Sequence, residues 1–354
     1  MDLNNQYTFK VTAIASAGSY TNVTAVNLPS TLKTINTNAF SNSQITTINI
    51  PAGTDDIKDG AFAQIENLTA ITVDAGNPKY TAEDGVLYET TSGNKYLKAY
   101  PVAKAGTTFT VPNGVYGVST NGFQLAKNLT TINLPASIQD LPTTKEANGF
   151  TSAKNLTAIK VDAGNTKFKD EDGVVLTQDG KTLVAYPFAR HGVANTAYNG
   201  PLATMHPGEV YTIPASVETI AKGAFAQVSE ITAVKLNNVK KISAGAFYSV
   251  RNLRNVELGA SVETIEDGAI TGSPDFTRFA VDSNNPNYMA DAEGIIYTKN
   301  QEELVLYPSG RAGAYTTLAT TKKIRKRAFY YAQKVEKVNF NSALEEIDND
   351  AFQT

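Results

Sequence analysis

Residues 213–258 contain one sequence pattern twice: IPASVETIAKGAFAQVSEITAVKLNNVKKISAGAFYSVRNLRNVEL. Each large apolar residue of the first copy returns 22 positions later in the second copy. The pairs are Ile220 and Ile242, Phe225 and Phe247, Ile231 and Leu253, Val234 and Val256, and Leu236 and Leu258. A period of about 20–50 residues is typical of solenoids, in which each coil packs mainly against its neighbours.

The same pattern recurs along most of the chain. Its aromatic position is occupied by Phe40, Phe62, Phe123, Phe150, Phe225, Phe247, Phe329 and Phe352, with Ile270 as the one substitute. A small residue precedes this position in every copy, which predicts close packing around a ring that fills the coil interior. The alternation from Ile132 to Leu134 predicts a short strand in each coil, and such strands stack in parallel at about 4.8 Å.

The 354 residues are interpreted as one solenoid, residues 28–354, preceded by an N-terminal cap, residues 1–27. Tyr7, Phe9, Val11 and Ala13 alternate as in a half-buried strand of that cap. A cap is expected because the first coil of a solenoid lacks a neighbour on one side.

Three similar insertions interrupt the coils, at about residues 74–110, 162–212 and 282–317. Each has an acidic turn that ends in glycine, two alternating runs around a polar turn, and a Tyr-Pro pair. Asp179-Gly180 between two such runs is typical of a β-hairpin. We therefore expect three hairpins packed beside the solenoid.

Composition excludes some function classes. The chain has no cysteine, so it has no disulfide framework and no thiolate chemistry. Its net charge of −3 gives no reason to expect nucleic acid as a partner. No apolar run approaches the roughly 20 residues of a membrane-spanning helix, and the first residues do not resemble an export leader. If the natural protein is exported, this is its mature part.

Several features could carry chemistry, but each also has a structural interpretation. His191 and His206 could serve a metal or a proton transfer, or be ordinary loop residues. The acidic turn at 170–173 suggests calcium, yet its spacing does not fit a known loop, which favours a solvated turn. The basic run at 322–327 could attract phosphate or sulfate, or line one exposed turn.

Two sets of repeated residues are also ambiguous. Asn67, Asn128 and Asn155 match glycosylation acceptors, but their shared place in the repeat favours a role in turns. Tyr100, Tyr186 and Tyr307 could stack on sugars, although their equivalent places favour packing. We find no pairing of nucleophile and base, so we predict no catalytic residue, no cofactor and no metal site.

The segments LPASIQDL, IPASVETIAKGAF and NLTTINL resemble the BspA-like branch of the leucine-rich-repeat proteins, and the similarity covers nearly all of residues 28–354. The resemblance implies a β-rich α/β fold: a right-handed solenoid with its parallel sheet on the concave face and three inserted β-hairpins. It also implies a bacterial, exported and often surface-anchored protein with roles in adhesion. The family often has a cysteine after the Phe, where this chain has Ile65, Val228 or Val250.

We therefore expect a noncatalytic, exported cell-surface protein that binds a protein partner, such as a host or matrix protein, and that is lipid-anchored, if at all, through residues outside this chain. A glycan-binding module and a structural spacer of a larger surface protein remain alternatives. Alternation along the strands predicts the residues of the concave binding face, which are Asn133, Lys160, Lys235, Glu257, Arg278, Lys337 and Asn339. Ala233 and Asn255 are also expected to point outward.

Overall fold

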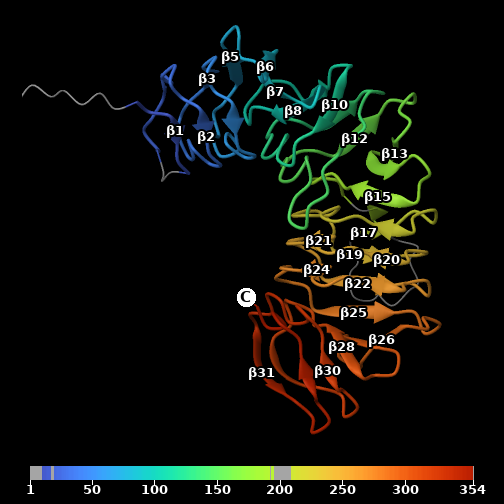
Figure 1. The fold of residues 1–354 in the computed structure, drawn as a ribbon. Helices are drawn as coiled ribbons and strands as arrows, with labels where there is room; N and C mark the ends of the chain where they lie inside the picture. The colour runs from blue at the N-terminus through green and yellow to red at the C-terminus, as the bar shows by residue number, and fades with distance from the viewer. Residues whose placement is uncertain (1–9, 17–19, 192, 195–208, 354) are drawn as a thin grey trace, which may run out of the picture.

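The protein is a curved stack of coils in a computed structural model, which describes residues 10–16, 20–191, 193–194 and 209–353 (Figure 1). The part of the chain that is described consists of short strands and turns, with no helix. The expectation of an α/β fold is therefore wrong, and the solenoid is a β-solenoid. Within these residues there is also no helix with the length and apolarity needed to cross a membrane.

One side of each coil carries the short strand that the alternation predicts, and most successive strands pair in parallel into what we call the wide sheets. Ile132 pairs with Ile159, and Val234 pairs with Val256, so the repeat is stacked in register. The wide-sheet strands are β3 (Thr47–Ile50), β5 (Ala70–Val73), β9 (Thr108–Thr110), β11 (Thr131–Leu134), β12 (Ala158–Val161), β17 (Glu209–Thr212), β19 (Ala233–Lys235), β22 (Asn255–Leu258), β25 (Arg278–Val281), β29 (Gly313–Thr316) and β31 (Val335–Asn339), and β16 (Val193–Ala194) is antiparallel to β17.

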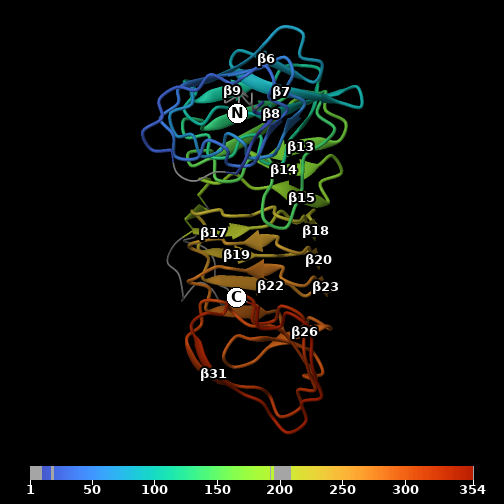
Figure 2. The same ribbon diagram turned by 60° about the vertical axis from the view of Figure 1, so that its left-hand side comes forward.

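A second side of the coils carries very short strands, also stacked in parallel. In Figure 2 the ladder of β18, β20 and β23 runs beside that of β17, β19 and β22. The strands of the second side are β1 (Ala13–Ile14), β2 (Thr34–Ile35), β4 (Asp56–Ile57), β10 (Val115–Val118), β18 (Thr219–Ile220), β20 (Lys241–Ile242), β23 (Thr264–Ile265), β30 (Lys323–Ile324) and β32 (Glu346–Ile347). A third side has β21 (Phe247–Tyr248) paired with β24 (Ile270–Thr271).

The predicted phenylalanines fill the interior of the coils. The rings of Phe225 and Phe247 are fully buried and stack 4.6 Å apart, and Phe123 stacks on Phe150 at 5.7 Å. Burying a ring of this size contributes roughly 1.5–3 kcal/mol. Phe352 stacks on Phe329 with one face, and 40% of its side chain is exposed.

Left-handed residues flank the interior ring and explain why no helix forms. Around Phe247 these are Gly245, with φ +66°, and Ser249, with φ +52°. The N–H of Ser249 donates to the carbonyl of Thr271 in the next coil at 2.8 Å, and Gly245 donates to Gly268 at 2.9 Å. A left-handed residue cannot continue an α-helix, so this arc of the coil is a series of turns that bonds to its neighbour instead.

Each insertion is a three-stranded antiparallel meander whose last strand belongs to the solenoid. In the second insertion β13 pairs with β14 and β14 with β15, while β15 pairs in parallel with β18. The meanders are β6 (Tyr80–Glu83), β7 (Val86–Thr91) and β8 (Asn94–Ala99), then β13 (Phe168–Glu171), β14 (Val174–Thr177) and β15 (Thr182–Ala185), and finally β26 (Tyr288–Ala290), β27 (Ile296–Thr298) and β28 (Glu303–Leu306). The expectation of separate hairpins needs this correction, because only the first two strands of each meander lie outside the stack.

The N-terminal region continues the stack. β1 pairs in parallel with β2, so Ala13 and Ile14 occupy the place of a second-side strand. The longer half-buried strand expected there is not found in the described residues, since Val11 is 52% exposed. Tyr7 and Phe9 lie outside the described residues.

The stack follows an arc whose inner edge, in Figure 1, carries β21 and β24. The wide sheets therefore do not by themselves form the concave side, contrary to expectation. The usual cause of a concave sheet is a row of helices behind it, because packed helices need about 8–10 Å each whereas strands need about 4.8 Å. The described coils have no helix, so this cause of a concave sheet is missing among them.

The turn of residues 143–148 is longer than the matching turns of other coils. It reaches the coils that contain Gly223 and Gly245. Asn148 donates from its amide to the carbonyl of Gly223 at 2.9 Å. A Cβ on Gly223 would lie 2.3 Å from the carbonyl oxygen of Thr144, and one on Gly245 would lie 2.0 Å from that of Lys145. Only glycine fits at these two places.

Candidate binding surface

The predicted surface residues lie on the wide sheets, and parallel register decides which of them are neighbours. Asn133 pairs with Lys160, and Lys235 pairs with Glu257, so each pair lies side by side on adjacent strands. Side chains at matching positions of parallel strands point to the same face of the sheet. The two pairs therefore form rows of the kind that the alternation predicts.

The remaining predicted residues do not join these rows. Arg278 pairs with Asn255 rather than with Glu257, and Lys337 pairs with Ala314. Asn339 pairs with Thr316 in the sheet of β29 and β31. The seven residues are thus spread over two rows and three sheets and do not form a single patch.

Two of the four basic residues predicted on this face, Lys160 and Lys235, have acidic partners within the described part of the protein. Lys160 forms an ion pair of 3.0 Å with Asp170 of the second meander, and Lys235 lies 3.7 Å from Glu257. Burial alone would raise the pKa of Asp170, but the N–H groups of Val161 and Gly173 and the Lys160 ammonium together lower it. The basic residues of this face therefore do not give a uniformly basic surface.

The centre of the largest wide sheet is more buried than alternation predicts. Ala233 and Asn255 were expected to face solvent, yet they are 0% and 1% exposed. Ala233 packs against Val210 of the neighbouring strand, which removes its methyl group from water. Both polar atoms of the Asn255 amide are buried without a hydrogen-bond partner.

Glu257, beside this centre, is held in an environment that disfavours its charge. Burial, and then the nearby charge of Asp282, raise the pKa of its carboxyl group. Its side chain is 13% exposed. The ammonium of Lys235 lies 3.7 Å from the carboxylate. A negative charge at this place is costly unless a cation remains close to it.

Elsewhere on the same face, polar side chains of successive coils are hydrogen-bonded to one another. Asn133 donates to the hydroxyl of Thr110 at 3.0 Å, and Asn339 donates to that of Thr316 at 3.3 Å. The separation in sequence is 23 residues in both cases. This face therefore has fewer free hydrogen-bonding groups than its composition indicates.

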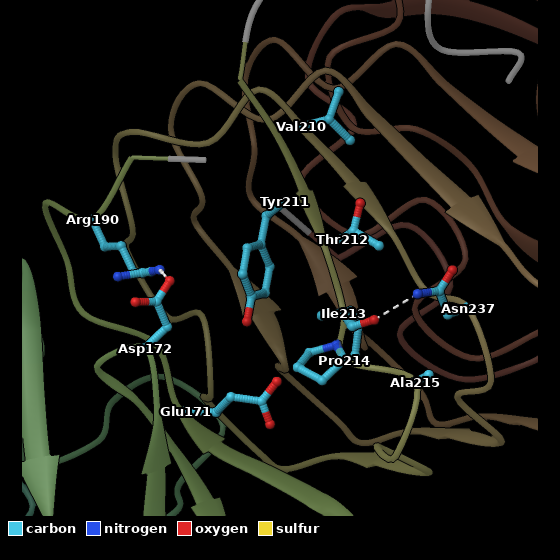
Figure 3. Close-up of a pocket in the computed structure, with 10 residues that line it drawn as sticks. All are labelled: Glu171, Asp172, Arg190, Val210, Tyr211, Thr212, Ile213, Pro214, Ala215 and Asn237. Carbon is cyan, nitrogen blue, oxygen red and sulfur yellow. Dashed lines mark hydrogen bonds and ion pairs between the residues drawn. The ribbon is translucent and has the colours of Figure 1, made fainter. Parts of the chain in front are cut away.

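A cavity of about 420 Å³ lies where the second meander meets β17 (Figure 3). Tyr211, Arg190 and Asp172 line it, and Arg190 pairs with Asp172 at 2.6 Å. Burial raises the pKa of the Tyr211 hydroxyl. On the other side of the cavity, Asn237 donates to the carbonyl of Ile213 at 2.7 Å.

The acidic turn of this cavity has a structural role that recurs in each meander. Arg190 and Asp172 have counterparts in Lys104 with Asp84, at 3.0 Å, and in Arg311 with Glu293. In each case the lysine or arginine that follows the Tyr-Pro pair forms an ion pair with an acidic residue of the turn. No group of His, Asp and Glu side chains in the described ranges could hold a metal ion.

The basic run is used mainly to join coils. Its ion pairs are Lys322 with Glu302 at 2.6 Å, Lys323 with Asp348 at 2.9 Å, Arg325 with Glu303 at 2.6 Å and Lys326 with Asp350 at 3.7 Å. These acids lie on the neighbouring coils, so most of the positive charge is balanced. Arg327 has no ion pair among the described residues; its guanidinium lies 5.1 Å from the ring centre of Tyr330.

The repeated asparagines and tyrosines have the structural roles that their spacing favours. Asn67 donates to Gln44 at 2.6 Å, and Asn155 donates to the carbonyl of Lys127 at 2.6 Å, so they connect turns of adjacent coils. Tyr100, Tyr186 and Tyr307 are 5%, 2% and 2% exposed, which confirms the interpretation as packing residues.

The histidines were considered for metal or proton chemistry. The ring of His191 is exposed and lies 4.0 Å from the carboxylate of Glu230, a partner that the sequence did not reveal. His206 is outside the described residues.

A hydrogen-bonded asparagine in each insertion was missed by sequence reasoning. Asn165 is 1% exposed and donates to the carbonyls of Pro135, at 3.1 Å, and Ile138, at 2.8 Å. Its side-chain oxygen accepts from the N–H groups of Lys167 and Phe168. The recurrence of VDAGN, with Asn77 and Asn285 as the counterparts of Asn165, is the signal that could have found it.

Comparison with known proteins agrees with these features. The family model for the BspA type leucine-rich repeat region matches six copies, at residues 11–92, 100–171, 208–291 and 314–354. No curated protein matches the chain.

Among solved structures, the chain is similar to a leucine-rich repeat protein from Eubacterium ventriosum. The identity is 16% and the TM-score 0.55, over 92% of this chain and 81% of that one. Weaker matches are a leucine-rich cell surface protein from Faecalibacterium prausnitzii, with 19% identity and a TM-score of 0.34 over 93% of this chain and 57% of that one, and the pneumococcal vaccine antigen PcpA, with 20% identity and a TM-score of 0.46 over 77% of this chain and 67% of that one. Since the family model matches most of the chain and the fold is shared, the protein belongs to the family of BspA-type leucine-rich repeat proteins.

Proposed function

We propose that this chain is a noncatalytic binding protein, exported and displayed at a bacterial cell surface, that contacts a protein partner through its repeat surface. The observation that carries the proposal is the register of the wide sheets. Residues of successive coils, such as Lys235 and Glu257, occupy matching positions and face the same way. A long, regular surface of this kind is what repeat proteins use to bind extended partners.

Export and surface display are supported by family membership, since the repeat resembles that of exported, surface-anchored proteins. The alternatives of a glycan-binding module and a structural spacer make different predictions. A glycan-binding module would bind sugars without a protein partner, and a spacer would bind neither.

The test measures binding of the purified chain to host cells, to immobilised matrix proteins and to a glycan array. A variant with Lys160→Glu, Lys235→Glu, Arg278→Glu and Lys337→Glu reverses the charges on the wide sheets. Lys154→Glu is the control for a charge reversal outside the sheets, because Lys154 is exposed on a turn. Circular dichroism checks that each variant is folded.

We expect protein binding that the fourfold variant loses and the control keeps. Binding that survives all four reversals excludes the wide sheets as the contact surface. Glycan hits without protein binding contradict the proposal in favour of the glycan-binding module, and the absence of any binding favours the spacer.

A further inference from the structure

Three tyrosines gather on the third side of the coils, near the inner edge of the arc. Tyr248 belongs to β21, which Figure 1 shows at that edge, and Tyr330 and Tyr331 follow Phe329 three coils later. The rings of Tyr330 and Tyr331 meet edge to face at 4.6 Å. Burial raises the pKa of Tyr248, and the neighbouring Glu146 and Tyr331 raise it further, so the three side chains form one cluster.

The three tyrosines remain accessible to a partner. Each is half-buried, in contrast to the packing tyrosines of the insertions. In the two coils between them, the place of Tyr331 is taken by Gly272, which has no side chain, and by Ser309, which is buried. The partly exposed rings are thus not covered by larger side chains at the matching positions of the coils between them.

Backbone strain gives a second reason to assign a role to this cluster. Tyr331 has φ +57° and Arg327 has φ +58°, in the left-handed region that large residues avoid. The stack requires that backbone, because the N–H of Tyr331 donates to the carbonyl of Gln353 at 3.0 Å, as Ser249 donates to Thr271. It does not require these side chains.

Other coils place smaller residues at the same two positions. The Arg327 position is Asn38, Gly60, Gly223, Gly245, Gly268 or Asp350 elsewhere, and the Tyr331 position is Asn42, Leu125, Ser152, Gln227 or Ser249. Large side chains that persist at strained positions point to a function of those side chains.

Arg327 supplies the charge of the site. Its aliphatic stem packs over Gly268, two coils earlier, with Cδ 3.3 Å from where a Cβ would be. Its guanidinium lies over Tyr330, and its Nε is buried without a hydrogen-bond partner. Because Nε is buried, the terminal N–H groups of this guanidinium are the donors that can reach a carboxylate of another molecule.

We propose that Tyr248, Tyr330, Tyr331 and Arg327 anchor a protein segment that presents one carboxylate beside an aliphatic or aromatic side chain. The proposal rests on the proposed function and assigns its main contact to a place outside the wide sheets. Tyrosine and arginine are the residues that most often dominate the energy of protein interfaces. Glu146 lies nearby and repels further negative charge, which favours a segment with a single acid over a strongly acidic one.

The test uses a displayed library of random peptides selected against the whole chain. We expect enriched peptides that contain Asp or Glu next to an aromatic or aliphatic residue. Their affinity should fall about tenfold or more in Arg327→Gly and in Tyr331→Gly, as expected for residues at the centre of an interface. Lys154→Ala, on an exposed turn outside the wide sheets, is the control and should bind as the unmodified chain does.

Thermal unfolding separates a binding role from a structural one. Glycine relieves the left-handed strain, so the melting temperature of Arg327→Gly and Tyr331→Gly should stay unchanged or rise while binding is lost. A fall in melting temperature that accompanies the loss of binding overturns the proposal, because it shows a packing role.

Two other outcomes also overturn the anchor. One is a set of enriched peptides that bind both glycine variants normally, and the other is no enrichment above the support alone. Neither outcome decides the proposed function, which depends on the charge-reversal experiment with host and matrix proteins.

Discussion

The ring of Tyr186 stacks on the ring of Phe225 at 4.9 Å, with 26° between their planes. Tyr186 comes from the second insertion, yet its N–H donates to the carbonyl of Ala224 at 2.8 Å, as the ring residue of a coil does. The first and third insertions repeat this, with Tyr100 beside Phe123 and Tyr307 stacked on Phe329. Each insertion is therefore a coil of the solenoid with two extra strands added before it.

Removing the Tyr186 ring should destabilise the protein as much as removing a core phenylalanine. We expect Tyr186→Ala to lower the free energy of unfolding by about 3–5 kcal/mol, because a cavity remains in a fully packed interior. Tyr186→Phe keeps the ring and should cost about 1 kcal/mol, for the bond from its hydroxyl to the carbonyl of Arg190. Urea denaturation measures both; a loss below 1 kcal/mol for the alanine variant would place the ring outside the core.

Asn165 should be among the most sensitive polar residues. Asn165→Ala leaves two carbonyls and two N–H groups without their partner, and we expect a loss of about 3 kcal/mol or more. Asn165→Asp keeps the acceptor but directs a carboxylate at the carbonyls of Pro135 and Ile138, so it should be no better tolerated. Equal stability of the unmodified chain and the aspartate variant at neutral pH would contradict this role.

Alanine substitutions at two glycines with similar backbone angles can distinguish the cost of backbone strain from the cost of steric crowding. Gly245 has φ +66° and no room for a Cβ, whereas Gly93 has φ +80° and open space around it. We expect Gly93→Ala to cost about 1 kcal/mol from backbone strain alone. Gly245→Ala should cost about 1–3 kcal/mol more, because Lys145 must move. Thermal unfolding of both variants gives the comparison, and equal losses would show that the turn of residues 143–148 yields freely.

Glu89 should make the protein less stable in acid. Burial alone would raise its pKa, but Lys98 at 3.1 Å and Lys79 at 3.0 Å lower it. A carboxyl group with a lowered pKa stabilises the fold above its unfolded pKa, near 4.3, and this contribution is lost as the pH falls through the folded value.

The measurement for Glu89 is chemical denaturation between about pH 3 and pH 7, where this group changes protonation. The unmodified chain should lose more stability below about pH 4 than Glu89→Gln does, since the glutamine variant has no proton to bind. Lys98 is 9% exposed in its side chain and also contacts Asp59, so it remains partly paired in that variant. Parallel pH curves for the two proteins would exclude Glu89 as a source of acid sensitivity.

The candidate surface was predicted only in part. Alternation placed Lys160 and Lys235 on the outer face of their strands, but the sequence did not show that Asp170 and Glu257 balance their charges. The tyrosine cluster could not be predicted, since Tyr248 and Tyr331 are more than 80 residues apart. The left-handed backbone at Tyr331 follows from stacking bonds that only the assembled coils form.

The amino-acid sequence by itself determined the coil and its register. Phe225 and Phe247 are 22 residues apart, and the other apolar residues repeat at the same interval, so neighbouring coils bury all of them together in only one alignment. The tertiary structure decided what replaced the expected helices, which edge of the arc faces inward, and how the insertions join the stack. These features depend on bonds between residues of different coils, such as that from Tyr186 to Ala224. Such bonds add to stability only when both coils are in place, so no local pattern in the sequence reveals them.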